Sequence, residues 1–169
     1  MLQLGTKAET LKNLYGKLQN AKVLNSYVFR TKEWKQDAKN IWNQIQHELP
    51  SEKWIVRSSA LNEDTEASSQ AGKFESVGDV SGQESFFSAV NTVIASFDDG
   101  NPDNQILVQP MLKNVKVCGV AFTMDPSTMG NYYVINYDTT GSTSAITSGT
   151  GMQNLSLIHI SEPTRLDVI

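Results

Sequence analysis

Apolar residues recur at helical spacing in three parts of the chain. These parts are residues 5–18, 31–48 and 83–97. Such recurrence predicts amphipathic helices, because it places the apolar side chains on one helical face. We predict Thr31 as the N-cap of the second helix. Trp34 and Trp42 lie on the apolar face of this helix, and we assign both to the core rather than to a binding platform.

Short apolar runs predict strands between and after these helices. The predicted strands are residues 23–29, 54–56, 105–111, 116–123 and 132–137, with a further apolar alternation at 74–80. The run at 54–56 ends in Arg57, Ser58 and Ser59, so we expect a buried strand that runs into a polar loop. We expect a mixed sheet with helices first, and then an antiparallel sheet. This order predicts an α+β fold.

The chain as a whole is mildly acidic and has one cysteine. Its 169 residues carry 14 Lys and Arg against 18 Asp and Glu, a formal charge of −4. No basic stripe occurs, which argues against a nucleic-acid-binding protein. Cys118 has no second cysteine for a disulfide or a CxxC metal pair. Neither a signal pattern nor an apolar run of the roughly 18 residues that span a membrane occurs, so we predict a cytoplasmic protein with no membrane partner.

Arg57 is the strongest candidate for a ligand contact. It follows an apolar run, stands beside several hydroxyl side chains and precedes Gly72, whose backbone can approach a ligand closely. An arginine in such surroundings suits an oxyanion or a phosphate group. The alternative is an ion pair between Arg57 and Glu63 or Asp64. The residue types alone leave both interpretations open.

The segment VRSSALNEDTEASSQAGKFESV, residues 56–77, resembles the nucleotide-binding signature of the phosphoenolpyruvate synthase and pyruvate phosphate dikinase group. This resemblance implies a domain of the ATP-grasp type that binds ATP. It also implies that Arg57 is a catalytic residue that neutralises charge on the transferring phosphates. Gly72, Lys73 and Ser76 would belong to a loop over the triphosphate, where this chain has Lys73 in place of the family's common glutamine. No Walker loop occurs.

The segment GTKAETL, residues 5–11, resembles the family's early glycine–lysine segment. The resemblance implies that Lys7 contacts the ATP phosphates. Thr6 and Ala8 stand where the family has glycines. The alternative for Lys7 is a solvated side chain in the first turn of a helix, where a cation is mildly unfavourable against the helix dipole.

Residues 105–111, QILVQPM, resemble the family's hinge strand. That strand joins two subdomains and holds adenine through backbone groups, which here implies Gln109 and Met111 as nucleotide-binding residues. The alternative for Met111 is a side chain that fills the core.

The resemblance implies a complete first subdomain at residues 1–107 and a truncated second one at 108–154. Residues 140–143 lack the acid of the family's glycine–leucine–glycine–glutamate turn. Residues 155–165, LSLIHISEPTR, resemble the in-frame translation of a sequencing-library adapter, so we exclude 155–169 as a non-native tail. The alternative is a native strand, since Leu155 and Leu157 alternate with polar residues.

On this resemblance the chain is the ATP-binding part of a larger phosphotransferase. The parent enzyme would transfer a phosphoryl group from ATP to a histidine and then to pyruvate. The ligands of Mg²⁺ and the acceptor domains would lie downstream, so no metal ligand is predicted here and the isolated fragment is expected to be inactive. Two alternatives remain open: another acceptor, such as an antibiotic or a glucan, or a non-catalytic nucleotide-sensing module.

Overall fold

The computed structural model describes residues 5–60, 64–65, 68–69, 75–125, 128–139 and 154–159. The chain divides into two compact units, Met1–Met111 and Leu112–Ile169, and each is described by itself. The predicted domain limits at residues 107 and 154 remain predictions. The described part of the chain contains no helix with the length and apolar character needed to cross a membrane.

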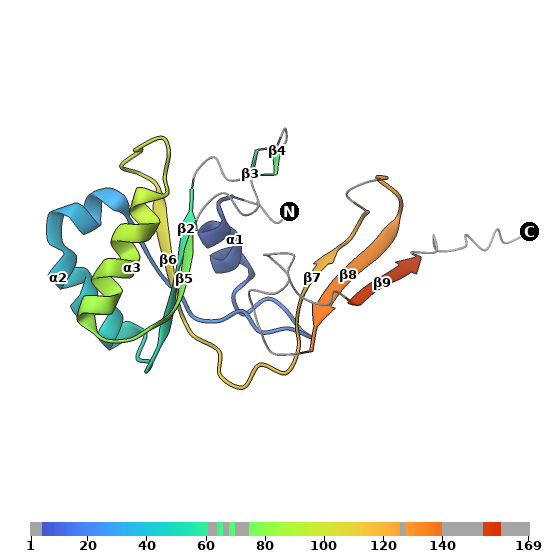
Figure 1. The fold of residues 1–169 in the computed structure, drawn as a ribbon, viewed down its shortest axis with the longest axis horizontal. Coiled ribbons are helices and arrows are strands. Elements are labelled where there is room, and N and C mark those ends of the chain that lie inside the picture. The colour runs from blue at the N-terminus through green and yellow to red at the C-terminus, as the bar shows by residue number, and fades with distance from the viewer. Residues whose placement is uncertain are drawn as a thin grey trace, which may run out of the picture. The chain divides into compact units, whose positions relative to one another are not determined.

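A four-stranded sheet forms the centre of the first unit (Figure 1). Its strands are β1 (Tyr27–Arg30), β6 (Gln105–Pro110), β2 (Trp54–Ser59) and β5 (Ser76–Val80), in that spatial order. All neighbouring pairs are antiparallel, so the predicted mixed sheet is wrong for these strands. The reason is topological. The strands joined by a helix run in the same direction, but a strand of opposite direction lies between them.

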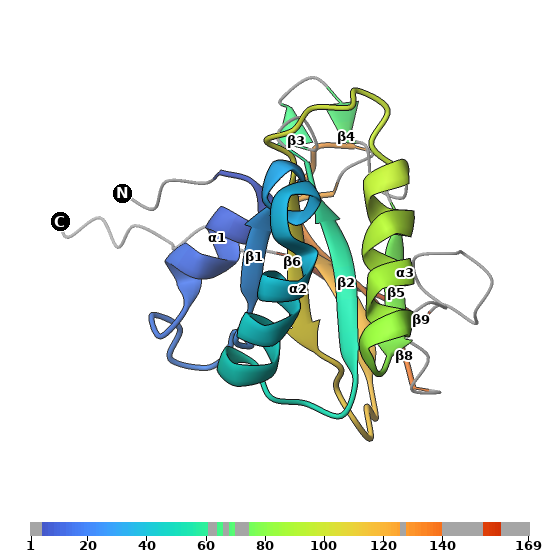
Figure 2. The ribbon, with the colours of Figure 1, turned by 90° about the vertical axis from the view of Figure 1, so that its left-hand side faces the viewer.

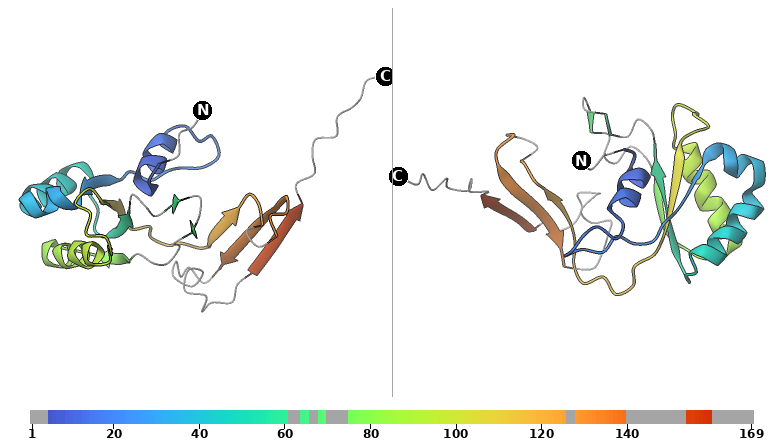
Figure 3. Two further views of the ribbon diagram at one scale, coloured as in Figure 1. Left: turned by 90° about the horizontal axis from the view of Figure 1, so that it is seen from above. Right: turned by 180° about the vertical axis from the view of Figure 1, so that it is seen from behind.

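Three helices accompany this sheet. They are α1 (Lys7–Leu14), α2 (Thr31–Glu48) and α3 (Gln83–Ala95). Figure 2 views the sheet through α2 and α3, which cover one face, and Figure 3 shows α1 on the opposite side of the sheet. Together with the antiparallel strands, these helices confirm the α+β prediction.

The apolar core lies between the sheet and the helices α2 and α3. Phe86 of α3 is fully buried at its centre, and its ring contacts those of Trp34, Trp42 and Trp54. Trp34 is buried, and Trp42 is partly buried and packs against the cluster. The assignment of these two tryptophans to the core is therefore confirmed.

The first helix is shorter than predicted. It ends at Leu14 rather than near Leu18, and the side chains of Tyr15 and Leu18 are 54% and 42% exposed. Gly16 follows with φ +71°, a left-handed backbone conformation that ends helices and that glycine adopts at little cost. The apolar spacing continues past residue 14, but the described part of the chain leaves these side chains exposed.

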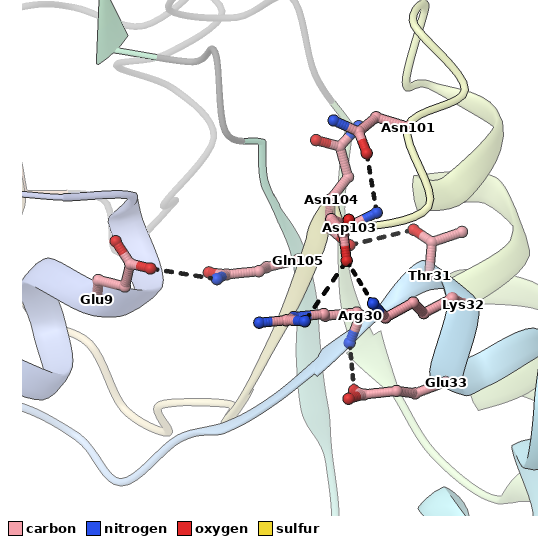
Figure 4. Close-up of polar contacts among 9 residues, drawn as sticks. All are labelled: Glu9, Arg30, Thr31, Lys32, Glu33, Asn101, Asp103, Asn104 and Gln105. Atoms are coloured by element: carbon pink, nitrogen blue, oxygen red, sulfur yellow. Dashed lines mark hydrogen bonds and ion pairs between the residues drawn. The ribbon is translucent and has the colours of Figure 1, made fainter.

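Polar contacts hold the start of α2 against the loop before β6 (Figure 4). The N-cap is Arg30, not the predicted Thr31, and the Arg30 N–H donates to Glu33 Oε2 at 2.7 Å. The Thr31 hydroxyl instead donates to the Asn104 carbonyl at 3.2 Å. The Lys32 ammonium donates to the Asp103 carboxylate at 2.7 Å and so holds the pKa of Asp103 below its usual value.

The second unit contains a three-stranded antiparallel sheet of β7 (Cys118–Phe122), β8 (Tyr132–Asp138) and β9 (Asn154–His159), in that order. The pairing of β7 with β8 confirms the predicted antiparallel arrangement of these segments. Strand β9 includes the first residues of the tail and pairs with β8. An open strand edge can pair with any extended segment, so this pairing leaves the origin of the tail undecided.

Deleting residues 155–169 is expected to leave the melting midpoint of the first unit unchanged within about one degree. The described residues of the tail pair with β8 in the second unit. Tryptophan fluorescence measures the first unit selectively, because all three tryptophans lie within Met1–Met111. A fall of several degrees, about 1 kcal/mol for a protein of this size, would show that the tail stabilises the first unit.

Candidate functional site

The predicted ligand residues gather on the sheet face opposite α2 and α3. Side chains alternate between the two faces of a strand. On β2, Trp54 and Val56 belong to the core under the helices, so Ile55, Arg57 and Ser59 point to the other face. This second surface, on the side of the sheet where α1 lies, is called the open face below; the name refers to the strand face and not to exposure, since Ser59 and Leu107 are both 0% exposed.

Strand register places the candidates beside one another on the open face. Arg57 on β2 lies directly opposite Ser76 on β5 and Leu107 on β6. Gln109, two residues after Leu107, pairs with Ile55 on the same face. Diagonal neighbours of this kind are about 7–8 Å apart, within the reach of an arginine side chain.

Met111 continues the line of β6 past its last residue. Its N–H donates to the Lys53 carbonyl at 2.9 Å, which extends the antiparallel pairing. A Cβ placed on Gly78 would lie 3.7 Å from Met111 Cε, an ordinary contact distance. Met111 is partly exposed and lies outside the core cluster under the helices. Its side chain therefore lies beside Gly78 on the open face.

Arg57 lies within a strand, not at the start of a loop. The sequence predicted that the strand ends before Arg57, but β2 continues through Ser59 because those residues pair with β6. The Nε atom of Arg57 is buried and has no hydrogen-bond partner among the described residues. Buried donors are nearly always paired in folded proteins, so such an atom indicates a missing partner.

The N-terminus of α1 brings Lys7 to the same end of β2. Lys7 Nζ donates to the Ser58 carbonyl at 3.5 Å, one residue beyond Arg57. Thr6 is the N-cap, and with Glu9 it forms a capping box. The Thr-x-x-Glu spacing of these two residues is a sequence signal for a helix start, and it agrees with the start of the helix predicted at residues 5–18.

Several predicted residues have no described structure. Gly72 and Lys73, expected in the loop over the triphosphate, lie outside the described residues, as does Glu63. Of Asp64, only the backbone is described, in the two-residue strand β3 (Asp64–Thr65) that pairs with β4 (Ser68–Ser69). The ion-pair alternative for Arg57 therefore remains untested.

Two cavities lie elsewhere in the first unit. One, of about 550 Å³, is lined by residues 81–85 at the start of α3, and the other, of about 420 Å³, lies beside β1 and α2. Neither is lined by Arg57, Gln109 or Met111. Within the described ranges, no group of three His, Cys, Asp or Glu side chains is placed to hold a metal ion.

Comparison with known proteins gives one family. The family model described as "Pyruvate phosphate dikinase, AMP/ATP-binding domain" matches residues 4–150, which is most of the chain. A search of curated proteins finds no match. The matched range contains Lys7, Arg57, Gln109 and Met111.

Proposed function

The chain belongs to the pyruvate phosphate dikinase AMP/ATP-binding domain family, and from this premise we propose that it binds ATP on the open face of its first sheet. The observation that carries this proposal is the buried Nε of Arg57, which has no hydrogen-bond partner among the described residues. A guanidinium binds phosphate oxygens through paired N–H donors, and a phosphate group would supply the partner that Nε lacks.

The two ends of the nucleotide are assigned to different residues. Arg57 and Lys7 would contact the phosphates, with Ser76 beside Arg57 in the register of the sheet. Gln109 and Met111 would border the adenine, since a base needs an apolar surface with a few backbone donors and acceptors. The loop with Gly72 and Lys73 would cover the triphosphate, as proposed from the family resemblance.

The proposed chemistry is phosphoryl transfer by a longer parent enzyme. In such reactions the protein contributes mainly positioning and stabilisation of charge on the transferred group. Arg57 and Lys7 would neutralise that charge. The proposed phosphoryl acceptors are a histidine first and then pyruvate. The described residues do not offer a set of ligands for Mg²⁺, so no step is assigned to that ion here.

Titration calorimetry of the chain with ATP and with adenosine tests the proposal. Met111→Ala is expected to lower the affinity for both ligands about tenfold, because it removes apolar contact with the base that the two share.

Lys7→Met should lower the affinity for ATP alone, by about tenfold, because adenosine has no phosphate for a charged donor to bind. A wild-type chain that binds neither ligand at millimolar concentration would refute the proposed function.

A further inference from the structure

We propose that the cross-strand pair Ser59 and Gln105 clamps the N-terminus of α1 and so positions Lys7 for the phosphates. The inference rests on the proposed function, because it assigns these residues a role in nucleotide binding. Ser59 and Gln105 lie directly opposite each other on β2 and β6, and both point to the open face. Neither is proposed to touch ATP, so both are positioning residues.

Gln105 holds the residue before Lys7. The Thr6 hydroxyl donates to Gln105 Oε1 at 2.8 Å, across 99 residues of sequence. Gln105 Nε2 in turn donates to Glu9 Oε1 at 3.5 Å (Figure 4). The other carboxylate oxygen of Glu9 accepts from the Thr6 N–H at 3.0 Å. The oxygen and the nitrogen of the Gln105 side-chain amide thereby attach the capping box of α1 to β6.

Ser59 holds the residue after Lys7. The Ala8 N–H donates to Ser59 Oγ at 3.0 Å, a contact that also occupies one of the free amides of the first helical turn. Ser59 is 0% exposed and Ala8 is 2% exposed, so water does not compete for this bond. The two residues that flank Lys7 are therefore attached to one cross-strand pair.

These contacts attach the start of a short helix whose burial is small. It has eight residues, and Ala8 is the only one of them that is buried. Helices of this length are not stable alone in water. Lys7 Nζ lies 3.5 Å from the Ser58 carbonyl, beside Arg57, and the backbone position of Lys7 sets the region that its ammonium can reach. Loosening the clamp should thus move a charge away from the phosphates without removing it.

The test compares ATP with adenosine on the full chain by titration calorimetry. Gln105→Leu keeps the size of the side chain and removes its donor and acceptor. It is expected to lower the affinity for ATP about tenfold, which is the scale of one hydrogen bond to a charged group. The affinity for adenosine should fall by less than twofold. The matched control is Gln36→Leu, the same change at an exposed position of α2, which should alter neither affinity.

A double-mutant cycle identifies the route of the effect. If Gln105 acts through Lys7, Gln105→Leu should cost nothing further in a Lys7→Met background. Additive losses would overturn the inference, as would an equal loss of affinity for adenosine and for ATP. If Gln105→Leu unfolds the chain, as seen by tryptophan fluorescence, Ser59→Ala tests the same clamp with the same expectations.

Failure of the clamp and failure of the proposed function give different results. Unchanged ATP affinity in Gln105→Leu and Ser59→Ala, with weakened binding in Arg57→Ala, would overturn the clamp alone. Unchanged affinity in Arg57→Ala and Lys7→Met would overturn the proposed function and the clamp with it. If the clamp variants lose ATP affinity, and this loss disappears in the Lys7→Met background, the clamp and the proposed function are both supported.

Discussion

Replacing Arg57 with alanine is expected to lower the affinity for ATP about a hundredfold and to leave the chain at least as stable as before. The affinity falls because charge-assisted hydrogen bonds are worth about 1.5–3 kcal/mol each, and a guanidinium makes more than one to phosphate. The stability is kept because Nε has no partner to lose among the residues that the structure describes. An unsatisfied buried donor costs about 1–3 kcal/mol, so its removal should raise the free energy of unfolding or leave it unchanged.

Two further variants separate this expectation from a structural role for Arg57. Arg57→Lys should recover only part of the affinity, because an ammonium does not reproduce the planar guanidinium fork. Arg30→Ala is the matched control. Arg30 is exposed, has its own partner in Asp103 at 3.5 Å, and should not affect ATP. If Arg57 is instead tied to Glu63 or Asp64, the alanine variant would lose stability, lysine would restore it, and ATP affinity would stay near normal.

The same substitution has a kinetic consequence in a parent enzyme that carries the acceptor domains. ATP-dependent phosphorylation of the histidine should fall by about two orders of magnitude, the effect of losing one preorganised donor to a developing charge. Quantifying phosphohistidine in the Arg57→Ala and wild-type enzymes at saturating ATP checks this. A normal rate would remove Arg57 from the chemistry while leaving it a role in binding.

Phe86→Ala should destabilise the first unit by about 3–5 kcal/mol. The Phe86 side chain is 0% exposed, and its ring centroid lies 5.1 Å from that of Trp42 and 6.0 Å from that of Trp34. Removing the ring leaves a cavity among side chains that are themselves too large to move into it. Urea unfolding followed by tryptophan fluorescence measures the loss, because the indole rings line the cavity.

The neighbouring residue provides the control for Phe86. Phe87 is only partly buried, although its ring lies 4.9 Å from Trp34, so Phe87→Ala should cost clearly less. Phe86→Leu should recover much of the loss, since it refills most of the volume. Equal costs at the two positions would contradict the assignment of Phe86 to the centre of the core.

Helix existence and the apolar core could be predicted from the sequence because both depend on local spacing. A 3.6-residue period places Trp34, Ile41 and Ile45 on one face, and all three are buried in the structure. Helix ends were less predictable. The end of α1 at Leu14 depends on what covers its apolar face, and the cap of α2 depends on a carbonyl at Asn104 that is distant in sequence.

By itself, then, the sequence determined the α+β class and the tryptophan core, and it predicted Arg57 and Lys7 as residues that contact phosphate. Only the tertiary structure decided which residues lie beside these two. Arg57 faces Ser76 and Leu107, and Lys7 is held between contacts from Ser59 and Gln105, because of the register among β5, β2 and β6. These strands are separated by tens of residues, and a one-residue slip in pairing would turn every side chain to the other face. Local periodicity shows that a strand forms but does not contain this register, which arises when the separate strands pack together.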